Sequence, residues 1–318
     1  MAHRVSLSLP VCNGERFIGA AVRSLLAQSF EDFELIITDN ASSDATEQIC
    51  REFATRDARL RYVRNERNIG AAANFNLGFK LASGEFFKWC AHDDFISGDF
   101  IEECVRALDE NDADVLAYGR QQGVDQEGSL IPWLSCDAPD LHGCTPPHRF
   151  RMVYKVQGFD AAMFGLIRRA ALAQSSLHQS YYGSDIALLA ELALLGSFRR
   201  VPNVTFYNRE HVARSINIAD KRARQAWHDP KFAARPIPEN IALLRHLVAI
   251  ASKQRHIAPL RKTLPGLVAW AMTPHQLARY SLELIGFASP PLQKHLRTVG
   301  LQALHALRGT PSQSQQEL

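Results

Sequence analysis

The chain has 318 residues, and its apolar and charged fractions, 46% and 22%, are those of an ordinary globular protein, which excludes a disordered or fibrous chain. Its net charge of +3 at pH 7 hides an asymmetry. Residues 1–198 contain 18 Lys and Arg against 27 Asp and Glu, whereas residues 199–318 contain 18 against 6.

Strand and helix patterns alternate along the first part of the chain. Strands are predicted over residues 4–9, 33–38, 60–64, 85–89 and 115–118. Helices are predicted over residues 17–28, 44–55, 71–82 and 99–110, and the second of them begins with Asp44 and Glu47 at the spacing of a capping box. Such repeated units predict an α/β fold with a mostly parallel sheet and helices on both faces.

The second part of the chain is less regular. Residues 123–149, rich in Gly, Pro, Asp and Cys, are interpreted as a long irregular loop. After it we expect a strand over 161–168, a helix over 185–195 and two short strands over 198–207. Further helices are predicted over 239–255, 274–285 and 290–307, before a polar and disordered tail over 309–318. On the first of these helices one apolar face consists of Ile241, Leu244, Leu247, Val248 and Ala251.

The expected location is the cytoplasm. The first residues enter a strand pattern at once, which leaves no room for the apolar stretch of a signal peptide. The longest apolar runs, 186–195 and 264–272, are shorter than the roughly 20 residues that span a bilayer. The six cysteines include no Cys-x-x-Cys pair, which favours reduced thiols over disulfides or a zinc site.

The most informative segment is the apolar run at residues 86–89, which is followed closely by the adjacent carboxylates Asp93 and Asp94. Ligands of open α/β folds bind where strands leave the sheet, so a carboxylate pair there indicates a divalent cation and a phosphate-bearing substrate. Three other segments are expected at the same crevice: the turn 10–15, the segment 39–44 and the residues 207–211. A fourth, residues 183–185, opens the helix predicted after it.

The ordered set of motifs resembles the inverting glycosyltransferases of family 2, which have the GT-A fold. The motifs are Pro10-x-x-Asn13-Gly14-Glu15, Ile37-Thr38-Asp39-Asn40-x-Ser42-x-Asp44, Asn68-x-Gly70-x-x-x-Asn74, Ala82-Ser83-Gly84-Glu85 and His92-Asp93-Asp94. The likeness runs from about Val5 to about Arg214. It implies a catalytic domain over residues 1–215 and a helical C-terminal region over 216–308.

The resemblance also implies roles for single residues. Those expected to contact the nucleotide sugar are Pro10, Val11, Glu15, Asp39, Asn74, His92 and Asp93. Asp94 is expected to bind a metal ion, and His211 to bind the same ion or touch the diphosphate. His92 stands where the family often has an acid that touches the ribose, and a neutral imidazole lacks the two acceptor oxygens of that acid.

Asp185 inherits the role of catalytic base, although Ser184 replaces the glutamate that precedes it in the family. Inversion needs a base on the side of the sugar opposite the leaving group. A carboxylate at a helix N-terminus stays ionised more easily, and such a base contributes roughly 10² to 10⁴ in rate. Mg²⁺ or Mn²⁺ suits a site of few carboxylates plus diphosphate oxygens.

Each role has a structural alternative. Asp93 and Asp94 can instead cap the following helix, and Asp44, Ser184 and Asp185 are at positions typical of helix N-termini. A lone histidine such as His211 is often only a polar surface or core residue. The basic C-terminal helices can be a solvated face, or they can lie against the anionic inner face of the plasma membrane. Nucleic-acid binding is disfavoured, since no stacking aromatics interleave with the basic residues.

The predicted function is metal-dependent transfer of a sugar, with a UDP-sugar as the expected donor, to a glycan or lipid-linked acceptor in cell-surface polysaccharide biosynthesis. One alternative is a nucleotidyltransferase of related fold, but the Gly- and Arg-rich loop that it needs after the first strand is absent. The other is a catalytically silent nucleotide- or glycan-binding scaffold.

Overall fold

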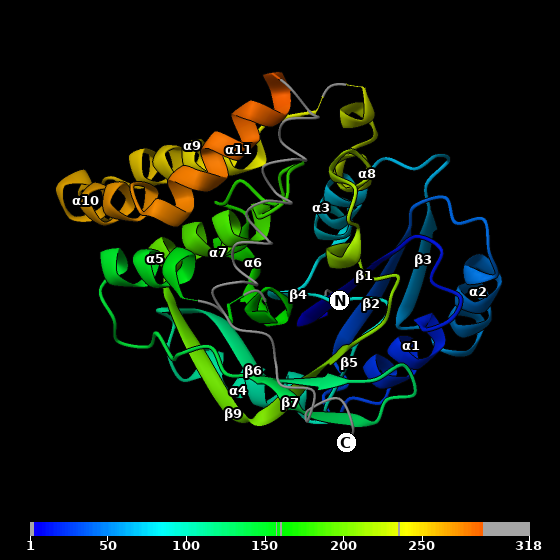
Figure 1. Cartoon of the computed structure of the whole chain (residues 1–318). Helices are drawn as coiled ribbons and strands as arrows, with labels where there is room; N and C mark the ends of the chain where they lie inside the picture. The colour runs from blue at the N-terminus through cyan, green and yellow to red at the C-terminus, as the bar shows by residue number, and fades with distance from the viewer. Residues whose placement is uncertain (1–2, 157, 160, 235, 289–318) are drawn as a thin grey trace, which may run out of the picture.

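A computed structural model describes residues 3–156, 158–159, 161–234 and 236–288, and it contains one mixed sheet (Figure 1). The strand order is β3-β2-β1-β4-β8-β6-β9-β5, and β7 pairs with β6 outside this path. The strands are β1 (Val5–Val11), β2 (Phe33–Asp39), β3 (Leu60–Arg64), β4 (Phe86–Trp89), β5 (Phe95–Ile96), β6 (Asp114–Val124), β7 (Leu130–Cys136), β8 (Leu166–Arg168) and β9 (Ser197–Arg209). The strands β3, β2, β1 and β4 are parallel to one another, and β6 is parallel to β9. The strand β8 pairs antiparallel with both β4 and β6 and so connects these two parts. The predicted α/β class and its parallel first half are therefore confirmed.

Helices cover both faces of this sheet (Figure 1). The helices are α1 (Ile18–Leu26), α2 (Thr46–Arg56), α3 (Ala71–Leu81), α4 (Phe100–Asp109), α5 (Pro146–Lys155), α6 (Arg169–Leu172), α7 (Ser184–Leu195), α8 (Lys221–His228), α9 (Glu239–Lys253), α10 (Leu260–Ala271) and α11 (Pro274–Ala288). Short 3₁₀ helices are η1 (Ala161–Phe164), η2 (Ser215–Asn217) and η3 (Pro230–Ala233).

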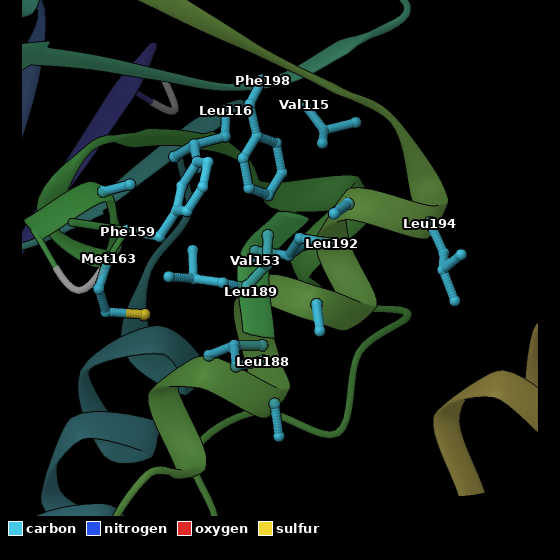
Figure 2. Close-up of a cluster of buried hydrophobic side chains, with 14 of the residues drawn as sticks. Val115, Leu116, Val153, Phe159, Met163, Leu188, Leu189, Leu192, Leu194 and Phe198 are labelled. Carbon is cyan, nitrogen blue, oxygen red and sulfur yellow. The ribbon is translucent and has the colours of Figure 1, made fainter. Parts of the chain in front are cut away.

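Two hydrophobic clusters lie on the two faces, because successive strand residues point to opposite sides. Leu35 and Ile37 of β2 pack with α1 and α4, whereas Ile36 between them belongs to the cluster under α5 and α7. Figure 2 shows Phe198 of β9 facing Leu189 and Leu192 of α7 in this second cluster.

The helices α9, α10 and α11 form a further layer over α5 and α7 (Figure 1). Leu247 and Ile250 of α9 and Leu267 of α10 are almost completely buried and belong to the same cluster as α7. The C-terminal helices therefore share a core with the sheet domain. Within the described ranges no helix combines the length and apolar character needed to cross a membrane.

Several predictions of local structure are wrong. The expected loop over 123–149 contains the end of β6, the strand β7 and the start of α5. The strand expected over 161–168 is η1 followed by the short β8, and the two strands expected around Pro202 are the single strand β9. The region predicted as a helix over 290–307 and the tail lie outside the described residues.

Two side-chain patterns also differ from expectation. Asp44 accepts a hydrogen bond from the backbone N–H of Thr46, and Glu47 pairs with Arg51 and Arg64, so no capping box forms. On α9 the buried residues include Leu243 and Ile250, whereas Val248 is 40% exposed. The reason is that α9 contacts α7, α10 and α11, so three neighbours rather than one determine its buried side.

Candidate active site

Asp93 and Asp94 follow the buried strand β4, as the sequence predicts, and both bind the end of β9 and the residues after it. The ring nitrogen Nε2 of His211 lies 2.8 Å from Oδ2 of Asp93. Oδ1 of Asp94 accepts a hydrogen bond of 2.8 Å from the backbone N–H of Arg209, and the Asn208 amide lies 3.3 Å from both of its oxygens. The structure thus brings His211 to Asp93 rather than to Asp94.

The two carboxylates differ in their electrostatic surroundings. Burial alone would raise the pKa of Asp93, but the nearby His92 and the hydrogen bond from His211 outweigh it and lower the pKa. Burial and the neighbouring charge of Asp93 raise the pKa of Asp94, and the hydrogen bonds from Arg209 and Asn208 offset this only in part. Two adjacent carboxylates without full compensation form a site where a cation is favoured.

The described residues contain no group of three or more His, Cys, Asp or Glu side chains that could hold a metal ion by themselves. A nucleotide-bound Mg²⁺ needs less, because phosphate oxygens and waters complete its coordination and the protein supplies one or two carboxylates. Asp93 and Asp94 are two such carboxylates. These residues therefore fit a divalent cation that arrives with a diphosphate.

The turn after β1 is attached to the start of α2. The backbone N–H of Gly14 donates to Oγ1 of Thr46 at 2.8 Å, and the Glu15 carboxylate accepts from the N–H of Ala45 at 2.9 Å. Glu15 remains exposed. A Cβ atom on Gly14 would lie only 2.7 Å from Cδ2 of His92, so the absence of a side chain here allows the His92 ring to pack against the turn. The turn and the aspartate pair are therefore neighbours.

Asp39 and Asn74 are in the expected region, but both are almost completely buried. Asp39 accepts hydrogen bonds from the hydroxyl of Tyr62 and the N–H of Ser42. The Asn74 amide donates to the carbonyl of Thr38 at 2.7 Å. Both side chains therefore hold the segments after β2 and β3 in place.

Asp185 lies in the first turn of α7, which follows Gly183 in a left-handed conformation with φ 92°. Its Oδ1 accepts a hydrogen bond of 2.9 Å from the N–H of Ile186. The segment before α7 contacts β4, the strand that precedes Asp93 and Asp94. The ring of His178 packs edge-on against Trp89 of this strand, with centroids 4.8 Å apart. This contact places His178, six residues before the start of α7, against the last residue of β4.

Sequence reasoning missed several side chains at or near this region. Phe17 packs on the ring of His211 with centroids 4.8 Å apart, and the guanidinium of Arg209 lies over Phe17. Glu191, fully buried on α7, binds Ser176 and Lys253. A single acid within an apolar helix is a sequence signal for a buried polar partner, but nothing in the sequence names that partner.

A family model described as glycosyl transferase family 2 matches residues 6–175, which is more than half of the chain. The chain belongs to this family. Among curated relatives, this family 2 member is 32% identical over 137 residues to an uncharacterized glycosyltransferase of Rickettsia felis, a match of 42% of the chain and 22% of the relative. It is 31% identical over 135 residues to the glycosyltransferase GlyG of Streptococcus pneumoniae, covering 42% of the chain and 45% of GlyG. The matches thus span less than half of these relatives.

Solved structures share the GT-A fold of this family 2 member. The S. aureus TarS 1–349 in complex with UDP-GlcNAc superposes with a TM-score of 0.59 at 17% identity, covering 89% of the chain and 80% of TarS 1–349. The mannosyltransferase PcManGT from Pyrobaculum calidifontis, in complex with GDP-Man and Mn²⁺, gives a TM-score of 0.51 at 15% identity, with coverage of 92% and 87%. At these identities the likeness concerns the fold.

Proposed function

We propose that the protein transfers a sugar, with inversion, from a nucleoside-diphosphate sugar to a hydroxyl of a glycan or lipid-linked acceptor. The observation that carries this proposal is the contact between Asp93 and His211, which unites two distant segments beside the turn after β1 within a family 2 fold. The nucleotide complexes of TarS and PcManGT support a nucleotide-sugar donor, with a UDP-sugar as the first candidate.

The donor is proposed to lie against Pro10, Val11, Glu15 and His92, at the open side of the turn. Asp39 and Asn74 act from behind this surface, because they are buried. Asp94 and His211 would hold a Mg²⁺ or Mn²⁺ ion together with the diphosphate, and Asp93 would contact the donor. The ion supplies positive charge that offsets the charge developing on the leaving diphosphate.

Asp185 is proposed as the base. In the transfer, a bond forms between the acceptor oxygen and the anomeric carbon while the bond from that carbon to the diphosphate oxygen breaks. The proton of the acceptor hydroxyl passes to the Asp185 carboxylate, and the electron pair of the broken bond leaves with the diphosphate. The N-terminus of α7 favours the carboxylate form that this role needs.

We also propose a role in cell-surface polysaccharide biosynthesis at the cytoplasmic face of the plasma membrane. The support lies on α10, where Val268 is 57% exposed and Arg261 and Lys262 are exposed as well, and on Met272 directly after this helix, which is 61% exposed. Apolar and basic side chains on one helix suit the surface of an anionic bilayer. In this proposal residues 1–215 catalyse and residues 216–308 contact the acceptor and the membrane.

The deciding experiment compares the wild-type protein with Asp185→Asn. We expect metal-dependent hydrolysis and transfer from a panel of nucleotide sugars to be lost in the variant, while nucleotide binding by calorimetry stays nearly intact. Turnover at the wild-type rate would exclude Asp185 as the base. A wild-type protein that binds nucleotide but never turns over would instead favour the silent scaffold.

A second measurement separates the two aspartates. Asp94→Ala should weaken Mn²⁺-dependent nucleotide binding and leave metal-free binding unchanged, whereas Asp93→Asn should weaken binding of the nucleotide sugar both with and without Mn²⁺. Equal Mn²⁺ dependence in the wild type and Asp94→Ala would exclude a cation held by Asp94.

A further inference from the structure

A cavity of about 270 Å³ lies beside the start of α7, outside the donor site described above. Its walls are the loop residues Gln179 to Tyr181, the segment with Lys231, Phe232 and Ile237, and His246 of α9. This volume corresponds to about nine water molecules, which is comparable with one sugar unit and small for a nucleotide. A larger cavity of about 400 Å³ is lined by Phe30 and residues of α4, and none of the proposed site residues lines it.

The cavity is close to the proposed base. Tyr181 closes a turn in which its carbonyl accepts the N–H of Ser184, and Asp185 is the next residue. Burial, with a smaller contribution from the charge of Asp185, raises the pKa of the Tyr181 phenol. The cavity therefore borders the turn that leads into α7 and the proposed base.

A chain of hydrogen bonds determines whether the Tyr181 hydroxyl donates or accepts. Oε2 of Glu191 lies 2.7 Å from Oγ of Ser176, which lies 2.9 Å from Nε2 of His246. Burial would raise the pKa of Glu191, but hydrogen bonds from Lys253 and Ser176 outweigh it and lower the pKa, so the carboxylate is ionised and can only accept.

The direction of the remaining bonds follows. Ser176 has one hydroxyl hydrogen and gives it to Glu191, so its oxygen accepts from Nε2–H of His246. Nδ1 of the neutral His246 ring must then accept from the Tyr181 hydroxyl, 2.7 Å away. The Tyr181 oxygen has therefore used its only hydrogen, and its lone pairs remain as acceptors for a donor such as a sugar hydroxyl.

The other walls suit a sugar as well. Phe232 offers an apolar ring, one face of which has the Lys231 ammonium 4.9 Å from the centroid, and Gln179 offers an amide. An apolar surface with few polar groups is typical of ligand pockets. The cation of Lys231 is bound by Asp229, with 2.7 Å between Nζ and Oδ2, so its charge is already compensated. This balance favours a neutral ligand over an anionic one.

We propose that this cavity is the acceptor subsite and binds one neutral sugar unit of the acceptor, with Tyr181 accepting from a sugar hydroxyl and Phe232 packing on the ring. The assignment rests on the proposed function. In this proposal the C-terminal helix α9 also contributes to acceptor binding, because its residue His246 orients the Tyr181 hydroxyl.

The test uses saturation-transfer NMR on the full chain with a panel of methyl glycosides: the β-glucoside, β-galactoside, α-mannoside and N-acetyl-β-glucosaminide. We expect at least one to bind the wild type, with affinity about tenfold lower in Phe232→Ala and several-fold lower in Tyr181→Phe. Phe30→Ala is the matched control, since this half-buried phenylalanine lines the other cavity. It should bind as the wild type does.

Absence of a signal from all four glycosides in the wild type would overturn the proposal, and so would equal binding by the wild type and Phe232→Ala. UDP binding, measured in parallel, separates this result from the proposed function. Binding of UDP without any glycoside refutes the subsite alone. Binding of a glycoside without any nucleotide refutes the transferase proposal and leaves a sugar site.

Discussion

The ion pair between Glu191 and Lys253 should be strongly asymmetric in its contribution to stability. Glu191 is fully buried on α7 and accepts hydrogen bonds from the N–H and hydroxyl of Ser176, each 2.7 Å long, and from Lys253 at 2.8 Å. The Lys253 side chain is 52% exposed. Removing the acid therefore takes the acceptor away from two hydrogen bonds of Ser176, whereas removing the base leaves Glu191 with both of them.

The expected magnitudes follow from these contacts. Glu191→Ala should lower the free energy of unfolding by about 3 kcal/mol, within the range for breaking a buried pair and leaving polar groups without partners. Lys253→Ala should cost roughly 1 kcal/mol or less, because the Glu191 carboxylate keeps both hydrogen bonds from Ser176 and water can occupy the half-exposed position of the removed ammonium. Urea unfolding followed by tryptophan fluorescence, with unchanged m values, measures both.

The control is Glu110→Ala, which removes an exposed partner of Arg199 and should change the free energy of unfolding by less than about 0.5 kcal/mol. Equal losses for Glu191→Ala and Lys253→Ala would refute the reasoning. A loss below about 1 kcal/mol for Glu191→Ala would mean that water satisfies Ser176. The hydrogen bonds from Glu191 through Ser176 and His246 to Tyr181 would then not form a rigid series.

The remaining predictions concern pH and four glycines. The lowered pKa of Glu191 gives stability that is present above its ordinary pKa of about 4.3 and is lost as pH falls through its folded value, so the stability gap between the wild type and Glu191→Gln should narrow below pH about 4.3. Gly14→Ala should weaken UDP binding in calorimetry, because its Cβ would overlap the neighbouring histidine ring, whereas Gly98→Ala, with nothing within 4 Å, should bind normally. Gly70→Ala should lower the urea midpoint more than Gly143→Ala does: both have positive φ, but only the first would meet backbone atoms, at 2.5 Å. Equal urea midpoints for Gly70→Ala and Gly143→Ala would mean that the close backbone contact at Gly70 does not contribute to the loss of stability.

Much of the fold could be predicted because strands and helices in the first half have clear periodicity. The strand β3 has the predicted bounds, and β1, β2 and β4 differ from prediction by two residues or fewer at each end. The strand β7 was missed because nearly all its residues are exposed, including Trp133 at 81%, so it has no alternation of buried and exposed positions. The helix α5 was missed because its two leading prolines resemble loop residues, although proline is common in the first turn of a helix.

The site was predictable in position more than in contacts. The sequence places Asp93 and Asp94 at the end of a buried strand, and their location is confirmed, while their roles and those of Asp185 and His211 stay predictions. The hydrogen bond from His211 to Asp93 joins residues 118 positions apart, and the one from Tyr181 to His246 joins residues 65 apart. Local patterns contain no information on such pairs, because the packing of whole helices and strands determines them.

The position of β9 between β6 and β5 has a consequence for biosynthesis. The strands β1 to β4 come from the first 89 residues and can pair as they leave the ribosome, but among the described residues β5 pairs only with β9, whose last residue is Arg209. More than a hundred further residues must therefore be synthesised before the segment with Asp93 and Asp94 can contact β9 and His211. In a nascent chain that stalls before residue 197, Asp93 and Asp94 would lack their contacts with β9, and this exposed segment would be open to chaperones and unable to form the nucleotide site.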